Sequence, residues 1–278
     1  MGQLEPAASR EEHVRRFTAL HASLTPVANR PRFERISVVA SGIDSLQLYP
    51  LSNSVLGVIV ETREQPGLVE VILEAVNLAG LQIVFFHGRL NRTILEDQRI
   101  RLLLDSGFLI ASELNTTDLP PCEYNGLLLS EEFWRPFADI DKVLVFQADA
   151  FFCPGARDRL PKFLHFDYIG TPWTVQRPIG IRVPSGCGGF SLRDVKLSLA
   201  AIQSMSPSTW PGGEDSFFAA SIEALGGRVA NVNDSRRWGA QNSWRGAPIG
   251  GHQPHHLSAA SRLLLALRCP SSRRLPLR

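Results

Sequence analysis

The sequence predicts an α/β domain built on a mostly parallel central sheet. Apolar, β-branched runs typical of buried strands occupy 55–62, 81–88 and 142–146. Segments of helical periodicity separate these runs, and a strand, helix and strand within about 30 residues form a unit whose two strands are parallel. Apolar residues make up 44% of the 278 residues and charged residues 20%. This composition excludes intrinsic disorder over most of the chain.

The first unit runs from the strand at 55–62 through a helix at 67–79 to the strand at 81–88. The helix has only one narrow polar stripe, so most of its surface is expected to be buried. Gly80 is expected to end the helix, since glycine is the usual residue at that position.

The alternation then continues toward the C-terminus. We expect a helix at 91–105, a strand at 108–114, a helix at 126–137, the strongest strand at 142–146 and a helix at 214–225. The C-terminal half is expected to be loop-rich, with Gly, Pro and Trp concentrated at 170–190 and 205–215. The predicted organisation is an N-terminal appendage (1–50), the α/β domain (51–256) and a basic C-terminal helix or tail (257–278).

Charge is distributed unevenly along the chain. Residues 235–278 contain eight arginines and no acidic residue, whereas residues 1–234 carry a net charge of −6. Such asymmetry often marks contact with anionic ligands or surfaces. We expect 269–278 to be a solvated tail with a role in peripheral membrane contact, and 236–256 to lie nearer a ligand. No nucleic-acid partner is expected.

The four cysteines lie far apart and none forms a CxxC pair, which argues against a zinc knuckle and against a disulfide scaffold. No apolar run is long enough to span a membrane, and the polar N-terminus lacks the apolar stretch of a secretory signal. The sequence therefore predicts a soluble, cytoplasmic protein that contacts at most the inner face of the membrane.

Four features could carry chemistry, and each also has a purely structural interpretation. Asp149 directly follows a buried strand, where it could hold a metal or a sugar hydroxyl, or serve as a turn residue. The glycines at 186–189 could bring the backbone close to a ligand or form a tight turn. Glu214 and Asp215 could include a general base or cap a helix. His252, between glycines and a proline, is a candidate ligand.

The motifs are more specific together than alone. In chain order they are YNGLLLSEEFW (124–134), FQAD (146–149), DYIGTPW (167–173), CGGFSLR (187–193), GGED (212–215) and PIGGH (248–252). This set resembles a largely uncharacterised family of microbial proteins classed as glycosyltransferases. The resemblance covers about residues 55–256.

The resemblance implies a GT-A-like fold, a nucleotide-sugar donor and a divalent metal. GT-A enzymes usually bind the metal with a DxD motif; here Gln147 replaces the first acid, and Asp149 matches the ligating carboxylate. His252 matches a late histidine ligand, and an imidazole ligand favours Mn²⁺ over Mg²⁺. The implied donor is a UDP- or GDP-sugar, and the implied acceptor is a glycan, a lipid-linked molecule or a small molecule.

The order of the last motifs is also similar to that of β-1,4-galactosyltransferases. This similarity implies that Asp215 is the base and Glu214 an acceptor ligand. Trp173 and Trp210 could stack against a sugar or belong to the core. The residues expected to bind the donor are Thr62, Arg63, Gln147, Asp149, Gly188 and Gly189.

Two alternatives remain open at the level of sequence. A nucleotidyltransferase, or another nucleotide-binding α/β enzyme, would share the sheet and the acidic metal site, but a nucleotidyltransferase would release pyrophosphate. A non-catalytic protein could bind carbohydrate or a membrane surface through the basic C-terminus and exposed tryptophans.

Overall fold

The central element is a six-stranded sheet with the strand order β3-β2-β1-β4-β7-β6. The computed structural model describes residues 43, 55–173, 186–210 and 212–275. Neighbours among β3, β2, β1 and β4 pair in parallel, and β7 runs antiparallel to both of its neighbours. The strands are β1 (Val55–Glu61), β2 (Gln82–His87), β3 (Leu109–Glu113), β4 (Lys142–Phe146), β6 (Tyr168–Thr171) and β7 (Cys187–Asp194).

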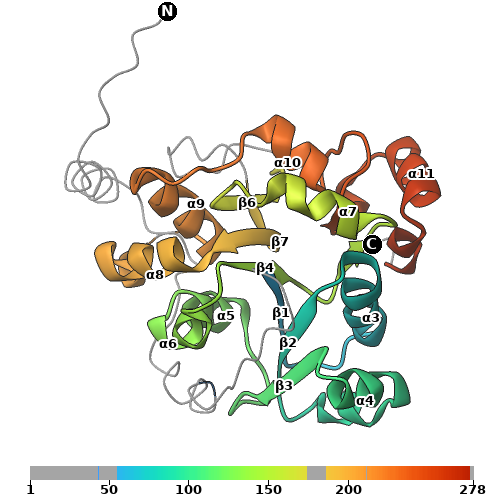
Figure 1. The fold of residues 1–278 in the computed structure, drawn as a ribbon, viewed down its shortest axis with the longest axis horizontal. Coiled ribbons are helices and arrows are strands. Elements are labelled where there is room, and N and C mark those ends of the chain that lie inside the picture. The colour runs from blue at the N-terminus through green and yellow to red at the C-terminus, as the bar shows by residue number, and fades with distance from the viewer. Residues whose placement is uncertain (1–42, 44–54, 174–185, 211, 276–278) are drawn as a thin grey trace, which may run out of the picture.

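Helices cover both faces of this sheet (Figure 1). They are α3 (Leu68–Ala79), α4 (Gln98–Asp105), α5 (Pro121–Leu128), α6 (Glu131–Trp134), α7 (Ala156–Arg159), α8 (Val195–Ser204), α9 (Glu214–Ala224), α10 (Val232–Trp238) and α11 (Ala259–Arg268). Alternation along β1 explains the two layers, because successive side chains of a strand point to opposite faces. Leu56, Val58 and Val60 pack with α5, α6, α8 and α9, whereas Val55 and Ile59 pack with α3 and α4. The predicted α/β architecture with a mostly parallel central sheet is confirmed.

A second, smaller sheet lies beside the first. It contains β5 (Ala150–Phe152), β9 (Gly250–His252) and β8 (Gly239–Ala240), in the order β5-β9-β8. The antiparallel pairing of β5 and β9 places Ala150 opposite His252. The sheet thereby brings the chain after β4 next to a segment about 100 residues later.

Two predicted helices are interrupted by capping residues. The segment 91–105 is a 3₁₀ turn followed by α4, because the Asp97 side chain accepts a hydrogen bond from Arg99 N and starts a new helix. The segment 126–137 is likewise not one helix, since Ser130 caps α6 by accepting from Phe133 N. An apolar period alone does not show where a cap intervenes.

Strand β7 was not predicted. Sequence reasoning placed residues 187–190 in a loop, yet they begin an eight-residue strand at the centre of the fold. The two glycines at its start weaken the β signal, because glycine is depleted in strands. Part of the predicted 170–190 loop, residues 174–185, lies outside the described residues.

The C-terminal segment packs onto the domain, contrary to the prediction of a solvated tail. Leu257, Leu265 and Leu275 form a third apolar cluster with Phe151, and Arg274 Nη2 lies 3.0 Å from Glu74 Oε2. Residues 269–275 are therefore not a free tail, and residues 276–278 lie outside the described part; the helix α11 occupies part of the segment 257–278 predicted as a helix or tail. Within the predicted appendage at 1–50 only residue 43 is described, and Ile43 is buried in the core.

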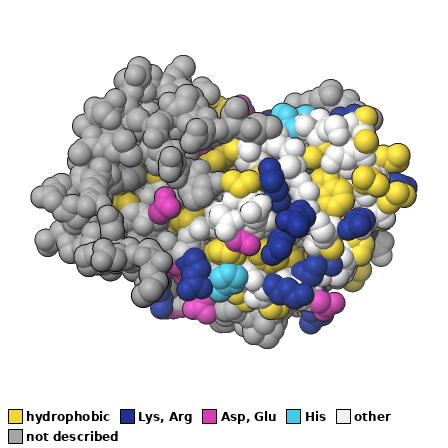
Figure 2. Space-filling model, turned by 90° about the horizontal axis from the view of Figure 1, so that it is seen from above, with side chains coloured by type: hydrophobic (Ala, Val, Ile, Leu, Met, Phe, Trp, Pro, Cys, Tyr) yellow, Lys and Arg dark blue, Asp and Glu magenta, His cyan; other side chains and the backbone are white. Residues whose placement is uncertain are grey.

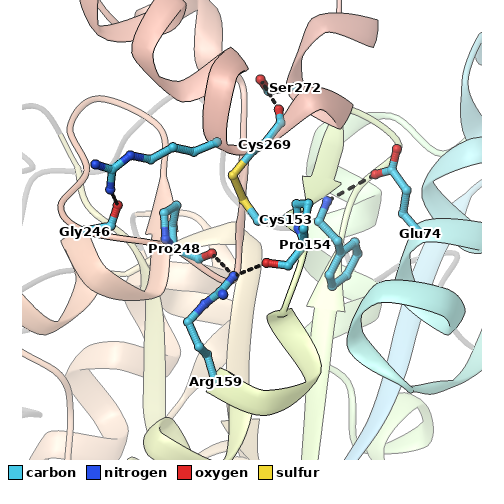
Figure 3. The surroundings of a disulfide bond; sticks show 10 residues. Glu74, Cys153, Pro154, Arg159, Gly246, Pro248, Cys269 and Ser272 are labelled. Carbon is cyan, nitrogen blue, oxygen red and sulfur yellow. Dashed lines mark hydrogen bonds between the residues drawn. A yellow bond between two sulfur atoms is a disulfide. The ribbon is translucent and has the colours of Figure 1, made fainter.

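Cys153 and Cys269 form a disulfide (Figure 3). The bond joins the end of β5 to the residue that follows α11, across a sequence separation of 116. The spacing of the cysteines in the sequence did not predict this pair. Disulfides persist mainly in oxidising compartments, so the bond weighs against the cytoplasmic location inferred from the cysteines. Across the described ranges, no helix has the length and apolar character needed to cross a membrane.

Candidate functional site

The candidate site lies where β4 ends and β7 begins. Because β7 is antiparallel to β4, its first residues meet the residues that follow β4, and Gln147 N donates to Gly189 O over 3.1 Å. Ligands of open α/β sheets bind at the carboxyl ends of the parallel strands. Three of the predicted motifs, FQAD, CGGFSLR and PIGGH, converge at this edge.

Three polar side chains meet here. His252 Nε2 lies 3.0 Å from Asp149 Oδ1 and 2.9 Å from Gln147 Oε1. The β5–β9 pairing causes this convergence, since it sets His252 across from the residue that follows Asp149. The structure therefore brings together the predicted donor- and metal-binding residues from two distant motifs. We call Gln147, Asp149 and His252 the open side of the site.

The Asp149–His252 pair is charged in this arrangement. Burial alone would lower the pKa of His252, but hydrogen bonds with Asp149 and Cys187 outweigh it and raise the pKa to about 10. Burial alone would raise the pKa of Asp149, and the bond from His252 outweighs it and lowers the pKa to about 2. The Asp149 side chain is still 45% exposed, whereas His252 is almost fully buried. One oxygen-bearing face thus remains accessible to a ligand.

Two residues that sequence reasoning did not assign support this pair. Gln253 Nε2 donates to Asp149 Oδ2 over 3.1 Å, and Gln253 adopts a left-handed backbone with φ 48°, which is uncommon for a residue other than glycine. Cys187 Sγ lies 3.9 Å from His252 Nδ1. Cys187 lies in the CGGFSLR motif, which could have indicated a role for it, whereas no sequence feature indicated a role for Gln253.

Gly188 and Gly189 separate the open side from a second group of polar residues. A Cβ on Gly189 would lie 2.5 Å from the His252 ring. A Cβ on Gly188 would lie 2.9 Å from Asp215 Cβ and would also collide with the Glu214 carboxylate. Both predicted donor-binding glycines are therefore required by close approach of neighbouring side chains.

We call Arg193, Glu214 and Asp215 the closed side of the site. The Arg193 guanidinium binds both carboxylate oxygens of Glu214, with Nη2 3.1 Å from Oε1, and both side chains are buried. Burial opposes the charge on Arg193, but Glu214 raises its pKa. The guanidinium carbon also lies 5.1 Å from the centre of the Phe218 ring. A charged residue at the end of an apolar segment could have indicated a buried ion pair at Arg193, but the sequence was not interpreted in that way.

Glu214 and Asp215 begin α9, and their environments differ. Both oxygens of Glu214 are bound by Arg193, so we revise its predicted role from acceptor ligand to positioning residue. Asp215 Oδ2 accepts from Gly188 N over 3.3 Å and Oδ1 from Ser216 N over 2.7 Å. Asp215 remains 7% exposed. Its role as base stays a prediction.

Tyr124 is a further polar residue next to both sides. Its hydroxyl is buried, and no described residue gives it a hydrogen bond of standard geometry, although the Gln147 side chain lies close enough to interact with it. Burial raises the pKa of Tyr124, and the negative charge of Glu214 raises it further, while nearby Gln147 acts in the opposite direction. An unpartnered buried hydroxyl is costly. Tyr124 is therefore a candidate ligand contact that sequence reasoning quoted within a motif without assigning it a role.

The other predicted donor-binding residues, Thr62 and Arg63, follow β1 at the same edge. Thr62 is buried. Arg63 forms a paired contact with Glu61, with Nε 2.9 Å from Oε1, and remains 58% exposed. The hydrogen bond to Glu61 raises the pKa of Arg63, and the charge of Asp149 contributes in the same direction. Arg63 immediately precedes Glu64, which belongs to the next feature along the chain.

That feature is a cavity of about 600 Å³ at the start of α3. Three carboxylates and two amides supply much of its polar lining, from Glu64, Gln65, Glu70, Asn91 and Asp97. Such groups accept hydrogen bonds from hydroxyls. Glu64, the residue after Arg63, lines this cavity.

The two tryptophans predicted to stack on a sugar lie elsewhere. Trp210 is fully buried, donates from Nε1 to Ser216 Oγ over 3.1 Å and packs against Phe217. It belongs to the core, so its predicted sugar contact is wrong for this structure. Trp173 is half-buried against the same core.

The open side brings together three side chains of metal-ligating type. The carboxylate, imidazole and amide donors share one space, with their donor atoms 2.9–3.0 Å apart. Across the described residues, the open side included, no group of three or more His, Cys, Asp or Glu side chains could hold a metal ion, so the open side would offer one carboxylate, one imidazole and one amide. An oxygen, nitrogen and oxygen donor set suits Mn²⁺ better than Mg²⁺, which prefers oxygen alone.

One family model matches part of the chain. The model of a family described as a protein of unknown function (DUF5672) matches residues 118–252, a range that contains all six quoted motifs. No curated protein matches the chain.

Several solved structures share part of the architecture. A glucose-1-phosphate thymidylyltransferase, so assigned, from Bacillus anthracis has 9% identity and a TM-score of 0.40, covering 64% of this chain and 86% of that chain. Mouse xyloside xylosyltransferase 1 has 10% identity and a TM-score of 0.47, covering 74% and 99%. S. aureus TarS, in complex with UDP-GlcNAc, has 15% identity and a TM-score of 0.43, covering 64% and 56%. Likenesses this distant say nothing of this chain's activity.

Proposed function

We propose that this protein is a metal-assisted glycosyltransferase that moves a sugar from a UDP- or GDP-sugar to an acceptor hydroxyl. One observation carries the proposal: a candidate metal site and a candidate base flank two adjacent glycines at the carboxyl edge of a parallel sheet. Glycosyl transfer needs these two functions close together, because the leaving diphosphate and the attacking hydroxyl meet at one carbon.

The cavity at the start of α3 is the proposed site for the nucleoside. Its carboxylates and Asn91 would accept hydrogen bonds from ribose hydroxyls, as acidic residues do in dinucleotide-binding folds. Arg63, whose pKa is raised in part by the charge of Asp149 and which precedes the cavity-lining Glu64, would add charge-assisted hydrogen bonds to the phosphates. The acceptor would be a glycan, a lipid-linked molecule or a small molecule.

Asp149, His252 and Gln147 would hold Mn²⁺ at the diphosphate. When bound, the metal supplies positive charge that stabilises the leaving group. Cys187 and Gln253 act as positioning residues: Cys187 contacts Nδ1 of His252 and so leaves Nε2 directed at the site. Gln253 fixes the second oxygen of Asp149.

Asp215 is the proposed general base for the acceptor hydroxyl. It need only take the proton as the glycosidic bond forms, so a carboxylate with ordinary basicity is adequate. The buried Arg193–Glu214 pair holds the first turn of α9, and thereby Asp215, against Gly188.

The test is a product assay on the purified full chain. The chain is incubated with a panel of UDP- and GDP-sugars, with and without Mn²⁺ and a set of glycan acceptors. We expect Mn²⁺-dependent release of a nucleoside diphosphate, lost in Asp149→Ala and retained in Asp158→Ala, an exposed carboxylate on α7.

Two outcomes would overturn the proposal. Release of pyrophosphate from a nucleoside triphosphate and a sugar phosphate would assign nucleotidyl transfer instead. Binding of sugars without turnover of any donor would assign a non-catalytic carbohydrate-binding protein.

A further inference from the structure

Helix α11 presents an apolar face that no described part of the chain covers. Leu263, Leu264 and Leu267 are 65%, 57% and 65% exposed. At 100° per residue they fall within an arc of about 100° on one side of the helix. The opposite side holds Leu265, which is fully buried. The helix is therefore apolar both on the side that packs against the domain and on the side that faces away from it.

This clustering distinguishes α11 from the rest of the described surface. The other large exposed apolar side chains, Leu90, Leu102, Phe108 and Val232, are scattered over different elements. Single exposed leucines are normal, whereas a contiguous apolar face marks an interaction site.

Positive charge surrounds this face. No acidic residue occurs between residues 235 and 278. Arg268 is exposed beside the leucines, Arg245 is exposed in the loop that contacts α11, and Arg273 is exposed just beyond it. The side chains of Arg245 and Arg273 make no ion pair with any described residue. Figure 2 shows hydrophobic and basic side chains together at the right of the view, where α11 lies.

The face is held rigidly on the domain. The Cys153–Cys269 disulfide fixes the C-terminal end of α11 to the end of β5 (Figure 3). Trp244 Nε1 donates to Ser261 Oγ over 2.9 Å near the helix start, and Arg268 Nη1 donates to Gly246 O over 2.6 Å. The leucines are thus presented outward by a fixed element.

We propose that α11 docks the protein onto an anionic lipid bilayer, with the three leucines entering the interface and the arginines contacting lipid phosphates. An apolar helix face flanked by arginines is the pattern of interfacial membrane helices. Charge complementarity selects this occupant over a second copy of the chain, since two α11 faces would bring like-charged arginines together. The proposal stands independently of sugar transfer.

Vesicle co-sedimentation of the full chain tests the proposal. Vesicles of phosphatidylcholine alone are compared with vesicles that also contain phosphatidylglycerol. We expect binding to the anionic vesicles only. The double variant Leu263→Ser/Leu267→Ser should weaken partitioning by at least about tenfold, because each leucine loses its apolar burial. Arg273→Gln should weaken it by about fivefold.

Leu102→Ser provides the matched control, because Leu102 is 62% exposed on α4, away from the arginines. It should bind as the wild type does, and all variants should keep the wild-type melting temperature. Absence of binding to anionic vesicles, or binding unchanged by the double variant, would overturn the proposal. A dimer in light scattering that the double variant abolishes would assign the face to a second copy instead.

Discussion

The open and closed sides of the site each contain a carboxylate, and the two carboxylates differ in exposure and in partner. The Asp149 carboxylate is 45% exposed and pairs with an imidazole, whereas the Glu214 carboxylate is buried and both its oxygens are bound by a buried guanidinium. The two sides lie on either side of Gly188 and Gly189.

This difference indicates that the open side binds the ligand, whereas the Arg193–Glu214 pair of the closed side supports the fold. An exposed carboxylate can exchange its partner for a ligand at little cost, while breaking a buried pair leaves an uncompensated charge. Substitutions on the open side should therefore act mainly on ligand binding, with a smaller loss of stability than breaking the fully buried pair would cause. On the closed side, Arg193 and Glu214 should act through stability, and only Asp215 through the reaction.

The largest expected effect belongs to Asp215. Asp215→Asn should lower transfer by about 10²- to 10⁴-fold, the usual contribution of a general base, and should leave donor binding unchanged. Asp234→Asn is the matched control, since Asp234 also lies in the first turn of a helix. Turnover and melting temperature are measured for both. Normal transfer with early melting in Asp215→Asn would reduce Asp215 to a helix-terminal residue.

Arg193→Met should lower the free energy of unfolding by about 3–5 kcal/mol, because Glu214 would be left buried without its partner. Urea unfolding measures the change. The double variant Arg193→Met/Glu214→Gln should recover part of the loss, since it removes the orphaned charge. A single variant as stable as the wild type would show that the pair does not support the closed side.

The open side has no buried ion pair of this kind, and the disulfide four residues after Asp149 braces it instead. Cys269→Ser should lower the free energy of unfolding by about 2–4 kcal/mol, because the bond closes a long loop. Cys122→Ser, at a free cysteine, should have little effect. Equal stability of the two variants, or free thiols at Cys153 and Cys269 in the purified chain, would contradict this account.

The smallest expected effect is a change in the pKa of His252. In the metal-free chain His252 should deprotonate near pH 10, against 6.5 for an unperturbed histidine. Because the folded pKa is raised, the stabilising contribution of the charged His252 is complete below about pH 6.5 and is lost as the pH rises toward 10. NMR of the imidazole measures the midpoint. It should fall in Asp149→Asn, and a midpoint unchanged by that substitution would show that Asp149 does not hold the charge.

Sequence predicted the open side better than the closed side, for a physical reason. Asp149 directly follows the most apolar strand, and His252 has little apolar sequence around it, so both carried local signals. Arg193 lies on β7, which two glycines concealed, and the buried state of Trp210 depends on its packing with Phe217. The parallel strands follow from local periodicity, whereas the Cys153–Cys269 bond and the packing of α11 depend on contacts between distant segments.

Isothermal titration of Mn²⁺ into the full chain, in the presence of UDP- and GDP-sugars, tests the central claim most directly. The claim is that Asp149 and His252 form the ligand-binding half of the site. The wild type and Asp158→Ala should bind Mn²⁺ together with a donor. Asp149→Ala should lose that binding while the chain remains folded, as its circular dichroism should show, and His252→Ala should weaken it less. Unchanged Mn²⁺ affinity in Asp149→Ala would contradict the account.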